Sequence, residues 1–153
     1  MKGVRFVGLA DEHIEPILEI EKESNGSPWS KRSFENEIGH GPTEFIVATQ
    51  KGAVVGYAGS WIIADECHIT TIAVSPELRR QGLGRRMMVE LLERSRDRGA
   101  LCATLEVRAE NEAAIKMYED LGFVSSGKRR AYYPNNQEDA IIMWLNNLGP
   151  SVA

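Results

Sequence analysis

The stretch Arg79-Arg80-Gln81-Gly82-Leu83-Gly84-Arg85-Arg86 (RRQGLGRR) lies between the strand-like run HITTIAV (68–74) and a helical pattern that begins at Met87. Its two glycines let the backbone adopt positive φ or come close to a ligand. N–H groups in the first turn of a helix have no partner within the helix, and the helix dipole adds partial positive charge there. The stretch therefore predicts either a phosphate-binding helix start, strengthened by its arginines, or a solvated basic helix start.

The spacing of the glycines narrows the kind of phosphate site. No Gly-Lys-Ser/Thr follows them, so the stretch is not a P-loop, and the third glycine of the dinucleotide fingerprint is missing. Nucleic-acid binding would need an extended basic surface with stacking aromatic side chains, which this stretch lacks. The formal net charge of −4 also argues against it. We expect no direct nucleic-acid partner.

The patterns on either side of this stretch predict the fold. Strands are expected over residues 4–10, 45–49, 54–63, 68–74, 101–107, 127–133 and 139–145. Four helices are expected. The first runs from Ile14 to Glu21, the second begins after Ser30 as its N-cap, and the others cover residues 87–99 and 112–121. Antiparallel hairpins with one strand–helix–strand crossover predict an α/β (α+β) domain with a mixed, mostly antiparallel sheet of about seven strands and about four helices. We expect one domain over residues 1–147 and a short tail over 148–153.

Composition sets the broad class of protein. With 42% hydrophobic and 26% charged residues among 153, the chain has the profile of a soluble globular domain. We expect no signal peptide, no membrane span and a cytoplasmic location. Cys67 and Cys102 lie in apolar runs and are expected to be buried thiols rather than a disulfide. The three histidines show no metal-ligand spacing, so we expect no metal.

Three polar residues near the second half of the chain are candidates for chemistry. Alternation along 101–107 places Glu106 on the face opposite Leu105. Its carboxylate could simply face water, but a central strand between two helices has little solvent face, so we expect it to line a cleft. Tyr118 shares a helical stripe with apolar residues and is by itself a core tyrosine. Asn111 fits the N-cap of the helix that carries Tyr118.

Arg79 to Gly84 resemble the Q/R-x-x-G-x-G/A signature of the Gcn5-related N-acetyltransferase (GNAT) superfamily. The segments IAVSPELRRQGLG (72–84), LEVRAENEAAIKMYEDLGF (105–123) and RRAYYP…EDAIIM (129–143) resemble the branch of that superfamily that acetylates protein N-termini, which includes bacterial ribosomal-protein alanine N-acetyltransferases. Pro28-Trp29-Ser30 resembles the start of that branch's second helix. The likeness covers nearly the whole chain in the right order.

The resemblance implies that acetyl-coenzyme A (acetyl-CoA) is the cosubstrate, with its pyrophosphate on the glycine-containing loop. In the family, a bulge and a splayed gap beside the strand of Glu106 free backbone N–H groups that bond the pantetheine and polarise the acetyl carbonyl. The implied cofactor-binding residues are Ile72, Ala73, Val74, Arg79, Arg80, Gln81, Gly82, Leu83, Gly84, Arg85, Asn111 and Tyr118.

The resemblance also assigns catalytic roles. An amine attacks a thioester only when it is unprotonated, so the reaction needs a proton acceptor and a donor for the departing thiolate. The matching residues are Glu106 as general base, acting through water, and Tyr118 as general acid. Neither cysteine has an acid–histidine pattern nearby, so direct attack by the amine is expected rather than an acetyl-cysteine intermediate.

The implied acceptor is the α-amine of a protein, with the N-terminal alanine of a ribosomal protein as leading substrate. The expected peptide-binding residues are Tyr132, Tyr133, Trp29, Glu138 and Asp139. Acetylation of a lysine, a polyamine or another small amine remains an alternative. A non-catalytic acyl-CoA-binding domain is the rival class, but it would need neither Glu106 nor Tyr118.

Overall fold

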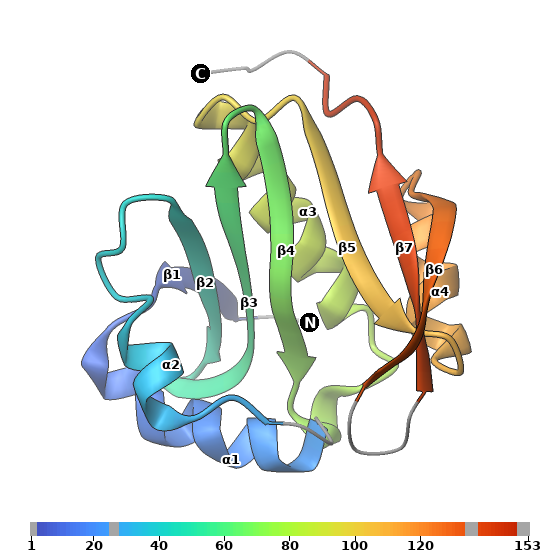
Figure 1. Ribbon diagram of the computed structural model, residues 1–153. Coiled ribbons are helices and arrows are strands. Elements are labelled where there is room, and N and C mark those ends of the chain that lie inside the picture. The colour runs from blue at the N-terminus through green and yellow to red at the C-terminus, as the bar shows by residue number, and fades with distance from the viewer. Residues whose placement is uncertain (1–2, 25–27, 134–137, 150–153) are drawn as a thin grey trace.

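The computed structural model describes residues 3–24, 28–133 and 138–149, without the side chains of residues 129–133 and 138. Its centre is one seven-stranded sheet in the order β1-β2-β3-β4-β5-β7-β6 (Figure 1). The strands are β1 (Val4–Gly8), β2 (Thr43–Gln50), β3 (Ala53–Ile63), β4 (Glu66–Val74), β5 (Cys102–Arg108), β6 (Val124–Tyr133) and β7 (Glu138–Leu145). Neighbouring strands are antiparallel except β4 and β5, which are parallel. The expected mixed, mostly antiparallel sheet is confirmed.

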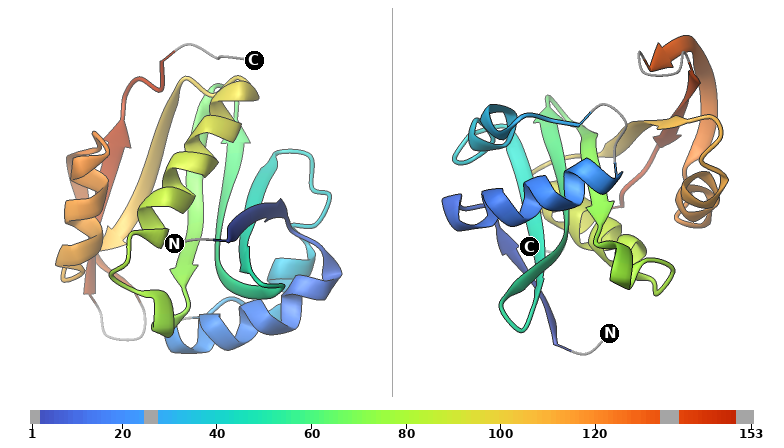
Figure 2. Two further views of the ribbon diagram at one scale, coloured as in Figure 1. Left: turned by 180° about the vertical axis from the view of Figure 1, so that it is seen from behind. Right: turned by 90° about the horizontal axis from the view of Figure 1, so that it is seen from below.

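Two pairs of helices cover the two faces of the sheet. The helices are α1 (Ile14–Ser24), α2 (Lys31–Glu35), α3 (Leu83–Asp97) and α4 (Glu112–Asp120). In Figure 1, α1 and α2 lie in front of the sheet, and the view from behind in Figure 2 shows α3 and α4 on the opposite face. The apolar core is divided accordingly. Phe34 packs with Tyr57 on the front face, whereas Met87 packs with Ile46 behind.

Helix α3 follows from local sequence signals. Its expected stripe, made of Met87, Met88, Leu91, Leu92 and Ser95, is buried throughout. The helix begins after Gly82, whose φ of 88° is left-handed, and ends before Gly99, whose φ is 103°. Both positions favour glycine because a Cβ is strained in that conformation. The crossover from β4 through α3 to β5 is thereby fixed at both ends of the helix.

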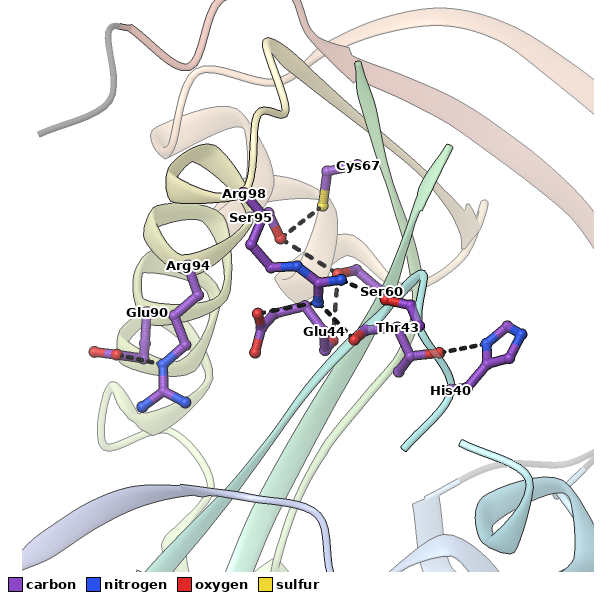
Figure 3. Close-up of polar contacts among 10 residues, drawn as sticks. His40, Thr43, Glu44, Ser60, Cys67, Glu90, Arg94, Ser95 and Arg98 are labelled. Atoms are coloured by element: carbon purple, nitrogen blue, oxygen red, sulfur yellow. Dashed lines mark hydrogen bonds and ion pairs between the residues drawn. The ribbon is translucent and has the colours of Figure 1, made fainter. Parts of the chain in front are cut away.

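The mixture of arginines with glutamates and aspartate near the end of α3 predicts a solvated face of mixed charge. The structure corrects this interpretation, because two of the arginines bind backbone carbonyls. Arg98 donates to the carbonyl oxygens of Thr43, at 2.7 Å, and Gly41, and Figure 3 shows it beside Glu44. Arg94 pairs with Glu90 at 2.7 Å and donates to the carbonyl of Phe6 at 3.2 Å. Their long side chains reach backbone carbonyls of β1, of β2 and of the turn before β2, so they tie α3 to both strands.

The sheet opens between β4 and β5, and this opening positions the candidate site. The two strands pair only at Glu66 with Cys102, Cys67 with Ala103, and His68 with Thr104. Beyond these pairs the strands diverge, as Figure 1 shows. On its other side, β4 shifts register against β3 between Gly59 and Ser60, which leaves Thr70 as an extra residue. Such a bulge bends the strand and leaves backbone groups without ladder partners.

Both cysteines are free thiols, as expected, but they are not equally buried. Cys67 is fully buried against α3, and this burial raises the pKa of its thiol. Cys102 is only half-buried, because it starts β5 where the strand emerges from the preceding turn.

Among the described residues, no helix combines the length and apolar character needed to cross a membrane. Packing continues past β7, since the N–H of Leu148 donates to the carbonyl of Leu101 at 2.9 Å.

Candidate active site

A cleft of about 790 Å³ lies in the gap where β4 and β5 separate. Its walls come from α1, the segment before α2, both diverging strands and α4. Among its lining residues are six that the sequence singled out: Trp29, Ile72, Ala73, Glu106, Asn111 and Tyr118. These residues span about 90 positions of the chain, so the fold brings together candidates that the sequence leaves far apart.

Glu106 occupies the position that strand alternation predicts. Leu105 and Val107 are buried in the core against α4 and β7, so Glu106 points to the other face with Thr104 and Arg108. Glu106 is half-buried and lines the cleft. Thr104 donates to the carbonyl of Met143 at 2.9 Å, which links the floor of the cleft to β7. A carboxylate there can accept a proton from a group bound in the cleft.

Tyr118 combines the core position and the cleft position that the sequence left as alternatives. It is 5% exposed, its ring centroid lies 5.9 Å from that of Phe123, and it also lines the cleft. Asn111 caps the same helix by accepting the N–H of Ala114 through Oδ1 at 3.2 Å. While Oδ1 serves the cap, the Nδ2 amide is available to donate to a ligand.

The edge of β4 facing the gap supplies backbone rather than catalytic side chains. Ile72 points to the α3 side and Ala73 to the α1 side, and both line the cleft. The hydroxyl of Thr70, at the bulge, is buried with no hydrogen-bond partner among the described residues. A buried polar atom without a partner is costly, and a ligand in the cleft could satisfy it. The bulge and the splayed gap expected from the resemblance are both present.

A buried carboxylate that the sequence did not assign to the site braces the front wall. Glu21 is 1% exposed and accepts the backbone N–H of Trp29 at 2.8 Å and the hydroxyl of Tyr57. Burial and this hydrogen bond raise the pKa of Tyr57, so its hydroxyl stays protonated and remains a donor. The available signal was an acidic residue in the apolar stripe of its helix, where a charge needs partners.

His68 is a second residue that sequence reasoning set aside. It lines the cleft, and its Nε2 lies 2.9 Å from the carboxylate of Glu66. In the sheet it is paired with Thr104 of β5 and Trp61 of β3. No local pattern predicts this position, because it depends on which strands become neighbours.

The basic stretch at residues 79–86 lies at the N-terminus of α3 and is not part of the cleft lining. Arg80 has a φ of 64°, and a left-handed conformation is uncommon for a residue other than glycine. Arg80, Gln81, Gly82 and Arg85 are exposed, whereas Leu83 is buried in the core. A Cβ on Gly82 would meet no atom of the chain within 4 Å. Open space beside unpaired helix N–H groups and exposed arginines is suited to phosphate.

Arg79 and Gly84 differ from the other members of this stretch. Arg79 donates to the carbonyl of Val74 at 3.2 Å and to the hydroxyl of Ser24 at 2.9 Å. These contacts join the end of β4 to the end of α1. Gly84 has no left-handed φ, and a Cβ there would make ordinary contacts with Met117 and Val74 at 3.6 and 3.8 Å. Of the two glycines, only Gly82 requires the absence of a side chain for its backbone conformation.

The predicted peptide-binding residues are only partly described. Trp29 lines the cleft, with its ring centroid 5.1 Å from that of Phe34. Asp139 pairs with Lys128 at 3.6 Å and is not among the cleft-lining residues. Tyr133 and Glu138 are register partners at the ends of β6 and β7, but their side chains and that of Tyr132 lie outside the described part of the structure. Their roles stay predictions.

Comparisons with known proteins show to which family the chain belongs. The sequence profile of the Acetyltransferase (GNAT) family matches residues 14–123. The [Ribosomal protein bS18]-alanine N-acetyltransferase of Escherichia coli K12 is 41% identical over 128 residues, which cover 82% of this chain and 86% of the relative.

Two solved structures also match this chain over nearly its whole length. The crystal structure of the ribosomal-protein-S18-alanine N-acetyltransferase from Escherichia coli matches with a TM-score of 0.87 and 36% identity, covering 98% of this chain and 96% of that one. Ard1 from Thermoplasma volcanium matches with a TM-score of 0.86 and 28% identity, covering 93% and 96%. The resemblance stated from the sequence motifs is confirmed. The chain belongs to the Acetyltransferase (GNAT) family.

Proposed function

We propose that the protein transfers acetyl from acetyl-CoA to the α-amine at the N-terminus of a protein, with the N-terminal alanine of a small-subunit ribosomal protein as its substrate. One observation carries the proposal. Glu106 on β5 and Tyr118 on α4 line the same cleft as the unpaired edge of β4. The relatives named for bS18-alanine N-acetylation support the choice of acceptor. The proposal includes a cytoplasmic location.

The described residues fit an acetyl-CoA cosubstrate at two places. The gap between β4 and β5 leaves the edge of β4 beyond His68 without pairing to β5, and the buried hydroxyl of Thr70 needs a partner. The N-terminus of α3 offers open space at Gly82 between exposed arginines. When bound, the cosubstrate supplies an acetyl thioester. Backbone N–H groups at Ile72 to Val74 would hold the pantetheine and face the oxygen that gains negative charge. Exposed residues of the 79–85 loop would hold the phosphates, while Arg79 braces the loop against Ser24.

The reaction then needs two proton transfers by this chain's residues. Glu106, through a water molecule, accepts a proton from the attacking amine as the C–N bond forms. Tyr118 donates its phenolic proton to the sulfur as the C–S bond breaks. Both partners are held in one ternary complex, so no acetylated enzyme forms. Trp29 would form the peptide-side wall, together with the Tyr132–Tyr133 segment.

Kinetics of a Glu106→Gln variant test this proposal. With acetyl-CoA and a peptide that begins with free alanine, the variant should lose about 10²- to 10⁴-fold in kcat, the usual contribution of a positioned general base. Its Kd for acetyl-CoA should stay close to that of the unmodified protein, since the side chain keeps its shape. Glu119→Gln, on the exposed side of α4, is the control and should keep its kcat. Full activity of Glu106→Gln would remove that residue from the mechanism.

The same assay separates an enzyme from a binding domain. Release of free thiol together with a peptide mass increase of one acetyl group supports the transferase. Tight binding of acetyl-CoA without turnover of α-amine, lysine or polyamine acceptors would instead support the non-catalytic alternative.

A further inference from the structure

A second hollow of about 380 Å³ adjoins the cleft and shares Trp29 with it. It lies between α2 and β3, and its other lining residues include Ser33, Asn36, Glu37 and Trp61. We propose that the acceptor chain continues from the cleft into this second hollow and places a basic side chain against Trp61. This inference rests on the proposed function, because it extends the peptide path of the same site.

The two hollows are neighbours on one face of the sheet. Trp61 on β3 is the register partner of His68 on β4, so their side chains lie side by side on the same face. His68 lines the cleft and Trp61 lines the second hollow. Trp29 borders both, so a bound chain meets a continuous floor and one shared wall.

Both tryptophans are held rigidly. The backbone N–H of Trp29 donates to buried Glu21 at 2.8 Å, and its ring packs on Phe34. The indole Nε1 of Trp61 donates to both carboxylate oxygens of Glu37, at 2.9 and 3.1 Å. Trp61 nevertheless remains 40% exposed, so a large ring of fixed orientation faces solvent. Rigid aromatic walls cost a ligand little ordering on binding.

The chemistry of the second hollow selects a cation. Glu37 is 6% exposed and also accepts the hydroxyl of Thr43 at 3.0 Å, so a carboxylate is held at the edge of the Trp61 ring, beside its N–H. Donation from the indole N–H to a carboxylate makes the ring more electron-rich and strengthens its attraction for cations. Among the described residues, no lysine or arginine lines this hollow. His40 is a basic group beside Glu37. Its Nδ1 lies 2.9 Å from the hydroxyl of Thr43 (Figure 3) and 4.0 Å from the carboxylate of Glu37, and its ring centroid lies 6.2 Å from that of Trp61 in an edge-on arrangement.

Sheet geometry gives the position of the basic residue in the acceptor. Thr104, His68 and Trp61 are successive register partners across β5, β4 and β3, and Glu106 lies two residues along β5 from Thr104. With strands about 4.8 Å apart and about 3.3 Å per residue, Glu106 and Trp61 are separated by at least about 12 Å. An extended peptide covers that distance in about four residues. The basic side chain therefore belongs about four residues after the acetylated alanine.

A position scan tests the inference without altering the protein. Ten-residue acceptors begin with alanine and carry one arginine, norleucine or glutamate at positions two to seven in a serine–glycine background. We expect kcat/KM for arginine to peak at one position between three and six, about 5- to 30-fold above norleucine, with glutamate lowest. A flat scan, or an equal peak for norleucine, would overturn the inference.

Variants identify where the preference arises. Trp61→Ala should flatten the arginine peak to less than about twofold, and Glu37→Gln should lower it. Ile63→Ala is the matched control, since Ile63 is an exposed residue further along β3 that does not line the second hollow. A peak that survives Trp61→Ala, with native folding checked by thermal melting, would also refute the inference.

An Ala-Ser-Gly tripeptide, too short to reach Trp61, separates this inference from the function on which it rests. If the tripeptide is acetylated and the scan is flat, only the second hollow is wrong. If no peptide with a free N-terminus is acetylated, the proposed function fails.

Discussion

Substitution of Gly82 by alanine separates folding from cofactor binding at the start of α3. Gly82 is the N-cap of α3 with a φ of 88°, and an added Cβ would meet no atom of the chain within 4 Å. The cost to folding therefore comes only from a left-handed conformation, about 1–2 kcal/mol. For a chain of this length, that cost corresponds to a fall in Tm of roughly 2–8 °C.

The effect on acetyl-CoA should be larger than the effect on folding. The open space beside Gly82 is where the proposed site places the pyrophosphate, so a methyl group there would displace phosphate from the helix N–H groups. The loss of one charge-assisted hydrogen bond costs about 1.5–3 kcal/mol. At 1.4 kcal/mol per tenfold, the Kd for acetyl-CoA should rise about 10- to 100-fold. Titration calorimetry measures this directly.

Gly52→Ala is the matched control for that experiment. Gly52 has a φ of 82°, and an added Cβ there also meets no atom within 4 Å, but it lies in the turn between β2 and β3. It should show the same fall in Tm and no change in Kd. Gly84→Ala should lower Tm less than either, since its backbone is not left-handed and its Cβ makes only ordinary contacts. If Gly82→Ala binds acetyl-CoA as tightly as Gly52→Ala does, the phosphates do not lie at the start of α3.

Three further substitutions test other parts of the site. Tyr118→Phe should lower kcat by about 10²- to 10⁴-fold with little change in Tm, because the buried ring is kept; full activity would exclude its hydroxyl as the acid. Tyr57→Phe removes a donor from buried Glu21 and should lower the free energy of unfolding by about 1–3 kcal/mol, measured in urea; unchanged stability would mean that the hydrogen bond does not support the front wall. Tyr133→Ala should raise the peptide KM more than the acetyl-CoA KM, and equal changes would remove Tyr133 from the peptide site.

Local signals were sufficient to predict most of the fold. The buried stripe of α3 follows from helical periodicity, and the caps at Ser30, Asn111 and Gly99 lie where the turn residues indicate. The orientation of Glu106 follows from strand alternation, because Leu105 must be buried. Each of these inferences needs only residues a few positions apart.

Contacts between distant segments were not predictable in the same way. The gap between β4 and β5 depends on where the two strands stop pairing, which is after His68 and Thr104. No residue type in either strand predicts that position. Arg98 reaches the carbonyl of Thr43, 55 positions earlier in the chain, and so differs from an ordinary solvated arginine. Glu21 and Tyr57 meet only because α1 packs across β3. The sequence showed a carboxylate in an apolar stripe, but not its partner.

One peptide with two competing amines distinguishes an α-amine acceptor from a lysine acceptor. The peptide begins with free alanine and carries one internal lysine, and it is incubated with the protein and acetyl-CoA at pH 7. Free α-amines have a pKa near 8 and lysine amines a pKa near 10.4, so roughly a hundredfold more of the α-amine is unprotonated. Incubation without protein, and incubation with Glu106→Gln, measure the uncatalysed background. Fragment-ion mass spectrometry locates the acetyl group during the first turnovers. We expect enzyme-dependent acetylation on the alanine nitrogen alone. Acetylation of the lysine while the alanine stays free would show that the acceptor is not an α-amine.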